Sequence, residues 1–230
     1  MSNERLEGIE ACVFDAYGTL FDFNSAAHAA SDELGSDWQR LSELWRQKQL
    51  QYTWLRGLAG RHADFWQVTA EALAYALNTL GLDRPGLHAR LLDLYLHLRC
   101  YADVPATLQQ LRACGMKLAI LSNGTPSMLA AVVRNSTLDG VFDAVLSVEE
   151  VGVFKPHPAV YRLAPQRLQL EPAAICFLSA NAWDAHCAKA SGLRVIWCNR
   201  FAQAAERIPE TPDGEIGDLT ELPALVCPQP

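Results

Sequence analysis

Asp15 is the residue of this chain whose position most favours covalent chemistry. It ends an apolar run, residues 9–14, and it precedes a turn at Gly18. A carboxylate held at the end of a buried strand is partly shielded from water, which makes it a better nucleophile. Aspartate is also a common residue of turns and of helix N-caps, so Asp15 taken alone is compatible with either role.

Three further polar clusters follow other apolar runs, and together they support the nucleophilic role. They are Ser122-Asn123, Lys155-Pro156 and the segment 179–184, which contains Ser179, Asn181 and Asp184. In an open parallel sheet, ligands bind outside the carboxyl ends of the strands. We therefore expect the three clusters to meet Asp15 at one edge of a sheet and to form an active site there.

Strands and helices that alternate from about residue 105 onward position these clusters. Short apolar runs predict strands at 9–14, 117–121, 142–146, 175–178 and 193–197. Periodic segments predict helices at 106–113, 125–133, 158–168 and 183–190. Such alternation indicates an α/β fold with a parallel sheet covered on both faces. The tail, 209–230, predicts one short strand or helix.

Residues 25–98 show a different pattern, which is helical throughout. Leu41, Leu44, Trp45 and Lys48 recur at helical spacing, and turns are expected at 57–60 and 83–86. About 75 helical residues after a first strand suggest an inserted unit. We therefore expect a Rossmann-like core, residues 1–20 and 101–230, that carries an inserted helical cap, residues 21–100.

The composition is typical of a soluble globular protein. Of the 230 residues, 50% are hydrophobic and 20% are charged. The net charge of −7 argues against a general nucleic-acid binder. The sequence has no apolar run long enough to span a membrane and no signal peptide, so we expect a cytoplasmic protein.

The seven cysteines are expected to be reduced thiols, mostly buried, because they are scattered and form no CxxC pair. The same scatter argues against a zinc site. The six histidines show no pairing with a serine or cysteine nucleophile.

The polar clusters resemble the four motifs of the haloacid dehalogenase superfamily, in the same order. The matching segments are FDAYGTLFD at 14–22, Ser122-Asn123-Gly124, Lys155-Pro156 and SANAWD at 179–184. Most members of that superfamily are phosphatases, which carry a second aspartate two residues after the nucleophile and bind magnesium. Here Tyr17 occupies that position, and a phosphate dianion facing Asp15 without a metal ion would be repelled. The resemblance therefore favours a metal-free reaction on another substrate.

A narrower resemblance lies in the cap. The segments LWRQKQL at 44–50 and GRHADFW at 60–66 are similar to the L-2-haloacid dehalogenases. This resemblance implies hydrolysis of short L-2-haloalkanoic acids to D-2-hydroxy acids through an aspartyl ester, with inversion at carbon. Water would be the only co-substrate, and neither a metal nor an organic cofactor is implied. The family often forms homodimers, and an aromatic-rich cap is compatible with one.

The resemblance also implies a role for each site residue. Asp15 is the nucleophile, and Thr19 and Lys155 orient its carboxylate. The halide would be received by Arg46, Asn123 and Phe65, and the substrate carboxylate by Ser122. The residues that would line the substrate pocket are Tyr17, Gln47, Leu50 and Trp183. The residues that would orient Lys155 and the hydrolytic water are Tyr161, Ser179, Asn181 and Asp184. Ala180 departs from the family, which often has a second serine there, and we expect modest tuning from it.

Several of these residues also have a structural interpretation. An arginine such as Arg46 on a helix is commonly a solvated surface residue, and Thr19 could cap a helix. Tyr161, Phe65 and Trp183 are aromatic residues of the kind that fill cores. Two other functions stay open at this point: a magnesium-dependent phosphatase of the same superfamily, and a non-catalytic binding protein on this fold.

Overall fold

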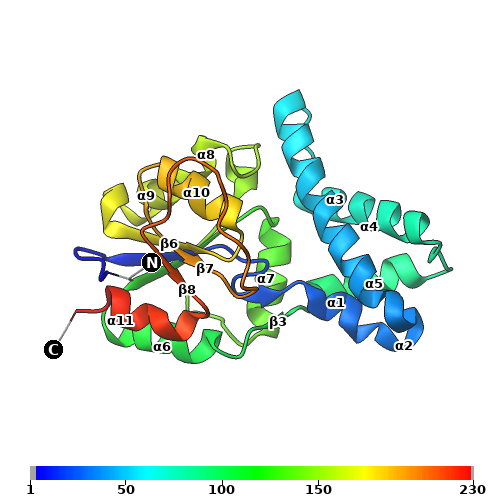
Figure 1. The fold of residues 1–230 in the computed structure, drawn as a ribbon, viewed down its shortest axis with the longest axis horizontal. Coiled ribbons are helices and arrows are strands. Elements are labelled where there is room, and N and C mark those ends of the chain that lie inside the picture. The colour runs from blue at the N-terminus through cyan, green and yellow to red at the C-terminus, as the bar shows by residue number, and fades with distance from the viewer. Residues whose placement is uncertain (1–3, 229–230) are drawn as a thin grey trace.

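The core of the molecule is one parallel sheet with helices on both of its faces (Figure 1). The computed structural model describes residues 4–228, and in that range the sheet has six strands in the order β5-β4-β1-β6-β7-β8. All neighbouring strands in it are parallel, which confirms the predicted α/β fold. The strands are β1 (Ala11–Phe14), β4 (Lys117–Ser122), β5 (Ala144–Ser147), β6 (Ile175–Ser179), β7 (Arg194–Cys198) and β8 (Gly214–Ile216).

The strand β1 lies between β4 and β6, which explains why it is apolar at every position. Its last residue, Phe14, is fully buried and lies opposite Ile120 of β4 and Leu178 of β6. A strand with neighbours on both sides and helices on both faces has no solvent-facing side. Because β4, β1 and β6 are parallel and in register, the residues that follow them emerge at the same edge of the sheet.

Helices connect the strands and cover the sheet. Figure 1 shows α8, α9 and α10 above the sheet and α6 and α11 below it, while α7 packs against β5. These helices are α6 (Val104–Ala113), α7 (Pro126–Asn135), α8 (Pro158–Tyr161), α9 (Leu163–Leu168), α10 (Ala182–Ala190) and α11 (Leu222–Val226). Short 3₁₀ turns lie at Gly35–Asp37, Val148–Glu150, Pro172–Ala174 and Leu219–Glu221.

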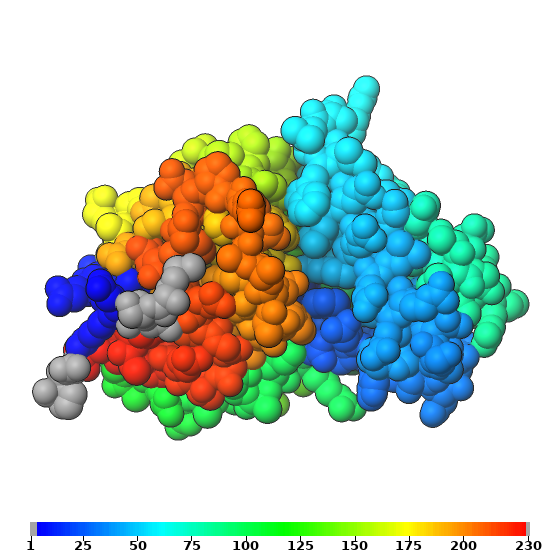
Figure 2. All heavy atoms as spheres, in the orientation of Figure 1, coloured from blue at the N-terminus to red at the C-terminus, as the bar shows by residue number. Residues whose placement is uncertain are grey.

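The chain between β1 and α6 forms the helices at the right of Figure 1, and α3 is the longest of them. They are α1 (Asn24–Ala29), α2 (Ser31–Leu34), α3 (Trp38–Ala59), α4 (Phe65–Leu80) and α5 (Leu87–Leu96). The chain enters and leaves this part through a short antiparallel pair, β2 (Phe21–Asp22) and β3 (Arg99–Cys100). The boundaries of the cap, 21–100, stay a proposal. Figure 2 shows that the cyan end of α3 projects beyond the rest of the surface.

Three expected features of secondary structure differ from the observed ones. The turn expected to begin at Gly57 is wrong, because α3 continues to Ala59 and ends only at Gly60, whose φ is +63°. One glycine inside a helix costs only about 1 kcal/mol, so it does not have to end the helix. The helix expected at 158–168 is divided at Arg162, since Pro165 has no N–H to donate to Tyr161. The tail forms both a strand and a helix, β8 and α11.

The prediction that all cysteines are reduced is wrong for one pair. Cys114, after α6, forms a disulfide with Cys227, after α11, and their Cα atoms are 5.9 Å apart. The two residues are separated by 113 positions, and they meet because α11 packs against α6. Sequence spacing does not reveal a pairing that depends on two distant helices. The remaining cysteines, Cys12, Cys100, Cys176, Cys187 and Cys198, are free thiols.

Candidate active site

Asp15 occupies the first position after β1, and its side chain is almost completely enclosed. The residue is 6% exposed, and its N–H donates to the Leu178 carbonyl at 2.8 Å, which continues the pairing with β6. One carboxylate oxygen, Oδ1, accepts from Lys155 Nζ at 3.0 Å. The other, Oδ2, accepts from Thr19 Oγ1 at 3.2 Å and from Asn181 Nδ2 at 2.9 Å. Both oxygens are thus held in fixed directions by donors from three different segments.

Lys155 is the cation that makes this buried carboxylate possible. Lys155 is 1% exposed, and its Nζ lies 3.0 Å from Asp15 Oδ1 and 2.9 Å from Asp184 Oδ2. Burial alone would lower the pKa of Lys155, but the negative charges of Asp15 and Asp184 more than offset it, and the pKa is raised. The ammonium form therefore persists between the two carboxylates. The backbone N–H of Lys155 donates to Asn123 Oδ1 at 3.0 Å, which links the end of β4 to this loop.

Asp184 and Tyr161 close the inner side of the cluster. Asp184 lies in the first turn of α10, and its Oδ1 accepts from the Tyr161 hydroxyl at 2.7 Å. Burial raises the pKa of Tyr161 well above its usual range, and the charge of Asp184 adds to this effect. Tyr161 consequently remains a neutral donor at physiological pH. Both oxygens of Asp184 are occupied, which fixes the carboxylate that holds Lys155 from the side opposite Asp15.

The Thr19 hydroxyl connects the first motif to the segment after β6, and two serine hydroxyls shape the turns after β6 and β4. Thr19 Oγ1 accepts from the Ala180 N–H at 2.8 Å, so the threonine proton is free to reach Asp15. Thr19 therefore acts as a link between two loops, and the alternative role as a helix cap is wrong. Ser179 Oγ accepts from the Asn181 N–H at 3.1 Å, which shapes the turn that presents Asn181. The hydroxyl of Ser122 accepts from the Gly124 N–H at 3.1 Å, and within residues 4–228 it makes no hydrogen bond to the Asp15 cluster.

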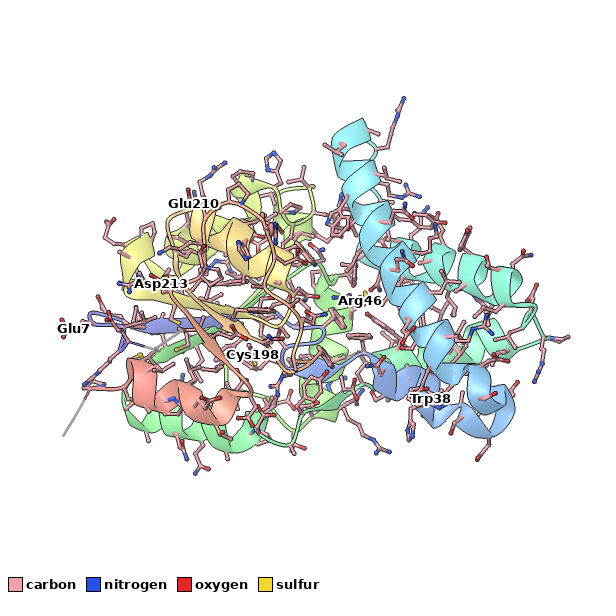
Figure 3. All side chains as sticks on the ribbon, viewed as in Figure 1. Glu7, Trp38, Arg46, Cys198, Glu210 and Asp213 are labelled. Carbon is pink, nitrogen blue, oxygen red and sulfur yellow. A yellow bond between two sulfur atoms is a disulfide. The ribbon has the colours of Figure 1, made fainter. Side chains whose placement is uncertain are left out.

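Arg46 is the contribution of the cap, and it reaches the core from α3 (Figure 3). Its Nη2 donates to the Tyr17 carbonyl and to Asn181 Oδ1, both at 3.3 Å. Its Nη1 donates to Gln49 Oε1 at 2.8 Å, and its Nε is buried without a partner. Within residues 4–228 the guanidinium takes part in no salt bridge. The cap therefore presents a cation that is bound by neutral groups and lacks a counterion.

Aromatic rings enclose the same space from the side. Tyr17 is buried, and its ring centroid lies 5.8 Å from that of Phe65 and 5.4 Å from that of Tyr95. Within residues 4–228 the Tyr17 hydroxyl has no hydrogen-bond partner, and it points at Gly124, where an added Cβ would lie 3.0 Å from it. Among the described residues, the Tyr17 hydroxyl and Arg46 Nε are thus buried donors without a hydrogen-bond partner.

The remaining predicted residues lie around a cavity of about 490 Å³ next to this cluster. Gln47, Leu50 and Trp183 line it together with Arg46 and Asn181. Trp183 is also packed edge-on against Trp54, with ring centroids 5.4 Å apart. Asn181 donates to Asp15 at 2.9 Å, whereas Asp15 is not itself among the residues that line this cavity. The structure thus places Gln47, Leu50 and Trp183 around a cavity beside the Asn181 side chain.

The sequence pattern does not single out two residues that hold Arg46 in place, Gln49 and Tyr95. Both are buried inside the cap, and Gln49 Nε2 lies 3.1 Å from the Tyr95 hydroxyl. A signal was present for Gln49. It follows Leu41 and Trp45 at helical spacing, so it lies on the buried face of α3, where an uncharged polar residue requires partners.

A metal ion of the kind that the superfamily's phosphatases bind does not fit these residues. The Arg46 guanidinium only donates, so the oxygen of Asn181 must face Arg46 and its nitrogen must face Asp15. The Asn181 nitrogen also lies 3.4 Å from the Tyr17 carbonyl. An N–H group and a guanidinium therefore occupy the acceptors that a magnesium ion would require as ligands. Within residues 4–228, no three His, Cys, Asp or Glu residues converge in a group that could hold a metal ion.

Fold and site together define a hydrolase of the α/β class with an aspartate as its candidate nucleophile. The sequence pattern of the haloacid dehalogenase-like hydrolases matches residues 9–192, and the chain belongs to that family. The resemblance inferred from the four motifs is thereby confirmed. Among the described residues, no helix is long and apolar enough to cross a membrane.

Known proteins of this family are similar over almost the whole chain. (S)-2-haloacid dehalogenase 1 of Pseudomonas sp. (strain CBS-3) is 44% identical over 222 residues, 96% of this chain and 98% of that protein. Haloacetate dehalogenase H-2 of Moraxella sp. (strain B) is 41% identical, over 96% of this chain and 100% of that protein. The structure of L-2-haloacid dehalogenase from Xanthobacter autotrophicus with chloropropionic acid covalently bound is 41% identical, with a TM-score of 0.88. This structural match covers 94% of this chain and 98% of the Xanthobacter chain.

Proposed function

We propose that the protein hydrolyses short L-2-haloalkanoic acids to D-2-hydroxy acids. One observation carries this proposal: the Asp15 carboxylate is fixed at both oxygens and lies beside Arg46, a cation without a counterion. An anionic substrate with an anionic leaving group suits a site that contains such a cation. The names of the relatives, (S)-2-haloacid dehalogenase among them, support the same substrate class.

The first step is a displacement at saturated carbon. A carboxylate oxygen of Asp15 attacks C2 of the substrate, the new carbon–oxygen bond forms an ester, and the carbon–halogen bond breaks. The halide leaves with the bonding electron pair and is received by Arg46, Asn123 and Phe65. Donors that are already oriented toward the leaving group stabilise its developing charge without reorganisation. Attack from the side opposite the halogen inverts C2, so an L substrate gives a D product.

The second step restores the enzyme. Water attacks the Asp15 carbonyl carbon, and the ester bond to the alkyl oxygen breaks. One proton of the water passes to that oxygen and the other to solvent, so the 2-hydroxy acid leaves with the original Asp15 oxygen and Asp15 is again a carboxylate. Lys155 and Thr19 hold the charge of the carboxyl group in both steps, and Asn181 and Asp184 orient Lys155 and the water, with Tyr161 and Ser179 behind them. Ser122 binds the substrate carboxylate, and Tyr17, Gln47, Leu50 and Trp183 surround the substrate and its path.

The reaction is proposed to proceed without a metal ion or an organic cofactor. The charge that a metal ion would supply is provided by Lys155, which lies 3.0 Å from the nucleophile. A halide leaves as a monoanion, whereas phosphoryl transfer requires a cation for its more concentrated charge. We also propose that the protein is cytoplasmic and forms a homodimer. Light scattering would test the homodimer directly.

The decisive experiment measures halide release from L- and D-2-chloropropionate in the presence of EDTA. We expect release from the L form only, and loss of release in Asp15→Ala. Asp22→Asn is the matched control, because Asp22 also lies in the first motif but its Oδ1 caps the Asn24 N–H, outside the site. A single turnover in H₂¹⁸O should place ¹⁸O in the peptide that contains Asp15, whereas direct attack of water on C2 would leave that peptide unlabelled.

The two alternative functions give different results in the same assays. A phosphatase would release phosphate from phosphate esters with magnesium and lose that activity in EDTA. A binding protein would bind a 2-haloacid and release no halide from either enantiomer while folded. Haloacetates are the next substrates to test, because a relative is named for haloacetate.

A further inference from the structure

A chain of buried hydrogen bonds crosses the interior of the cap and ends at Arg46. Gln49 lies at its centre, one turn after Arg46 on α3, and is 1% exposed. Its amide nitrogen Nε2 donates to Thr69 Oγ1 at 2.7 Å and to the Tyr95 hydroxyl at 3.1 Å. Its amide oxygen Oε1 accepts from Arg46 Nη1 at 2.8 Å. A single side chain thus joins α3, α4 and α5 to the guanidinium.

The direction of these bonds is determined by chemistry at both ends. Arg46 has only donors, so it must face the oxygen of the Gln49 amide. The Thr69 hydroxyl donates to the Phe65 carbonyl at 2.6 Å and therefore accepts from the Gln49 nitrogen. Every polar atom of the Gln49 side chain has a partner, and the reverse orientation of the amide would oppose two donors at Arg46 and two acceptors at Thr69. The network consequently has one arrangement, which is what a fixed guanidinium position requires.

Because the Gln49 side chain is uncharged, it does not neutralise the positive charge of Arg46. A carboxylate in place of the Gln49 amide would pair with Arg46 and reduce its attraction for an anion. It would also place an acceptor opposite Thr69 Oγ1, which has no proton to give in that direction. Gln49 therefore holds the Arg46 guanidinium by a hydrogen bond and leaves its positive charge available to attract an anion.

We infer that Gln49 is the positioning residue of Arg46: through Thr69 and Tyr95 it fixes the guanidinium that receives the leaving halide. This inference rests on the proposed dehalogenase function. The network also reaches the core, because the Tyr95 ring stacks on Tyr17 at 5.4 Å with an interplanar angle of 25°. The cap packing that fixes Gln49 thus also sets the position of α3 relative to the motif-one loop.

The test compares Gln49→Met with leaving groups of different quality. Steady-state kinetics with L-2-chloro-, bromo- and iodopropionate should show a loss of kcat/KM of about 10- to 100-fold for chloride, the range expected for a hydrogen bond to a charged group. The loss should be smallest for iodide, which leaves most easily and depends least on Arg46. Gln51→Met is the matched control, because Gln51 is exposed on the same helix and its side chain accepts from Lys48, away from Arg46.

Two further variants separate positioning from general damage to the cap. Gln49→Glu keeps the shape, and its loss should exceed that of Gln49→Met, because it also neutralises the cation. In an Arg46→Lys background, Gln49→Met should cost less than about 3-fold, since residues that act as a unit are not additive. Thr69 is one hydrogen bond further from Arg46 than Gln49 is, so Thr69→Val should show the same leaving-group dependence with a smaller loss. This variant tests the inference if Gln49→Met does not fold.

The outcomes are distinct. A loss that is equal for the three halides, or that multiplies with that of Arg46→Lys, would overturn the inference, because a merely structural role predicts both. If the wild-type protein released no halide at all, the proposed function would fail, but calorimetric titration with sodium bromide would still decide on Gln49. Weaker bromide binding by Gln49→Met than by Gln51→Met would support the positioning role, and equal binding would reject it.

Discussion

The core and the cap supply the two halves of the site, and they treat charge in opposite ways. In the core, Lys155 lies between Asp15 and Asp184, at 3.0 and 2.9 Å, so each buried charge has a partner. In the cap, Arg46 is held by Gln49, Tyr17 and Asn181 through neutral oxygens only. In the core half every buried charge thus has a partner of opposite sign, although two carboxylates share one ammonium, while the cap half retains one cation for a ligand.

This difference separates stability from function. Removing one partner of a buried ion pair leaves an uncompensated charge, which is strongly destabilising. Removing a cation that has no counterion leaves no such charge behind. Variants of the core half should therefore lose both activity and stability, and variants of the cap half should lose mainly activity.

Lys155→Met is expected to have the largest effect. Two carboxylates would remain buried without their cation, at a cost of about 3–5 kcal/mol in the free energy of unfolding. Halide release should fall at least about 10³-fold, because the charge of the nucleophile is no longer held. Denaturant unfolding and steady-state kinetics measure the two losses. Lys189→Met is the matched control, since Lys189 also pairs with an aspartate of the core, Asp213, but away from the site.

The pH dependence of stability gives a second measure of the same pair. The pKa of Lys155 is raised in the folded protein, so its share of the stability is present below the pKa of an unfolded lysine, about 10.4. That share is lost only as the pH rises through the higher folded value. Wild-type stability should therefore contain a decrease above about pH 10 that Lys155→Met lacks. Equal slopes in both proteins would show that Lys155 is not the ammonium of the pair.

Arg46→Lys should have the next largest effect, and it should lower the activity while leaving the stability almost unchanged. A lysine keeps the charge but cannot span Gln49, Tyr17 and Asn181 at once, so kcat/KM should fall about 10²-fold. The free energy of unfolding should change by less than about 1 kcal/mol, because the arginine has no counterion to abandon. Arg56→Lys, on the same helix and paired with Glu71, controls for the helix itself. A stability loss as large as that of Lys155→Met would abolish the distinction between the halves.

Arg200 bonds to the two core segments that flank the cap in the chain, and its replacement should give an intermediate result. It donates twice to the Thr19 carbonyl, just before the cap, and twice to Asp103, just after it. Arg200→Met should lower the free energy of unfolding by about 3 kcal/mol, because the partly buried Asp103 carboxylate loses its cation. Activity should fall only about 10-fold, through a shift of Thr19 against Asp15. Comparison with Arg194→Met, whose arginine pairs with Asp213 elsewhere, isolates the effect of the junction.

The sequence predicts the core half far better than the cap half. Asp15, Ser122 and Ser179 lie at or next to the ends of apolar runs, and the rule that strand ends meet at one edge places them together. Gln49 and Tyr95 are separated by 46 residues on two helices, and no local pattern shows that their side chains meet. Periodicity indicates which face of a helix is buried, but it does not indicate the angle at which two helices pack.

The same limit explains why the disulfide between Cys114 and Cys227 is not predicted from the sequence. Cys114 and Cys227 each look like isolated thiols, because the contact between α6 and α11 that joins them depends on the complete fold. The tail contains both a strand and a helix where one element is predicted, and β8 pairs with the edge strand β7. A general rule for parallel sheets places distant strand ends together, whereas no such rule identifies a contact between two particular helices.

The Cys114–Cys227 disulfide should have the smallest effect on activity and so sets the baseline for the comparison. Its loop of 113 residues restricts the unfolded chain, and its loss in Cys114→Ser should lower the free energy of unfolding by about 2–4 kcal/mol. It lies after α6 and α11, where neither half of the site has a residue, so kcat and KM should stay within about 2-fold of wild type. Reduction of the wild-type protein should reproduce both results, with Cys100→Ser as a control for loss of a thiol. A stable variant with impaired turnover would mean that the far end of the core is coupled to the cap, and the division into two halves would have to be abandoned.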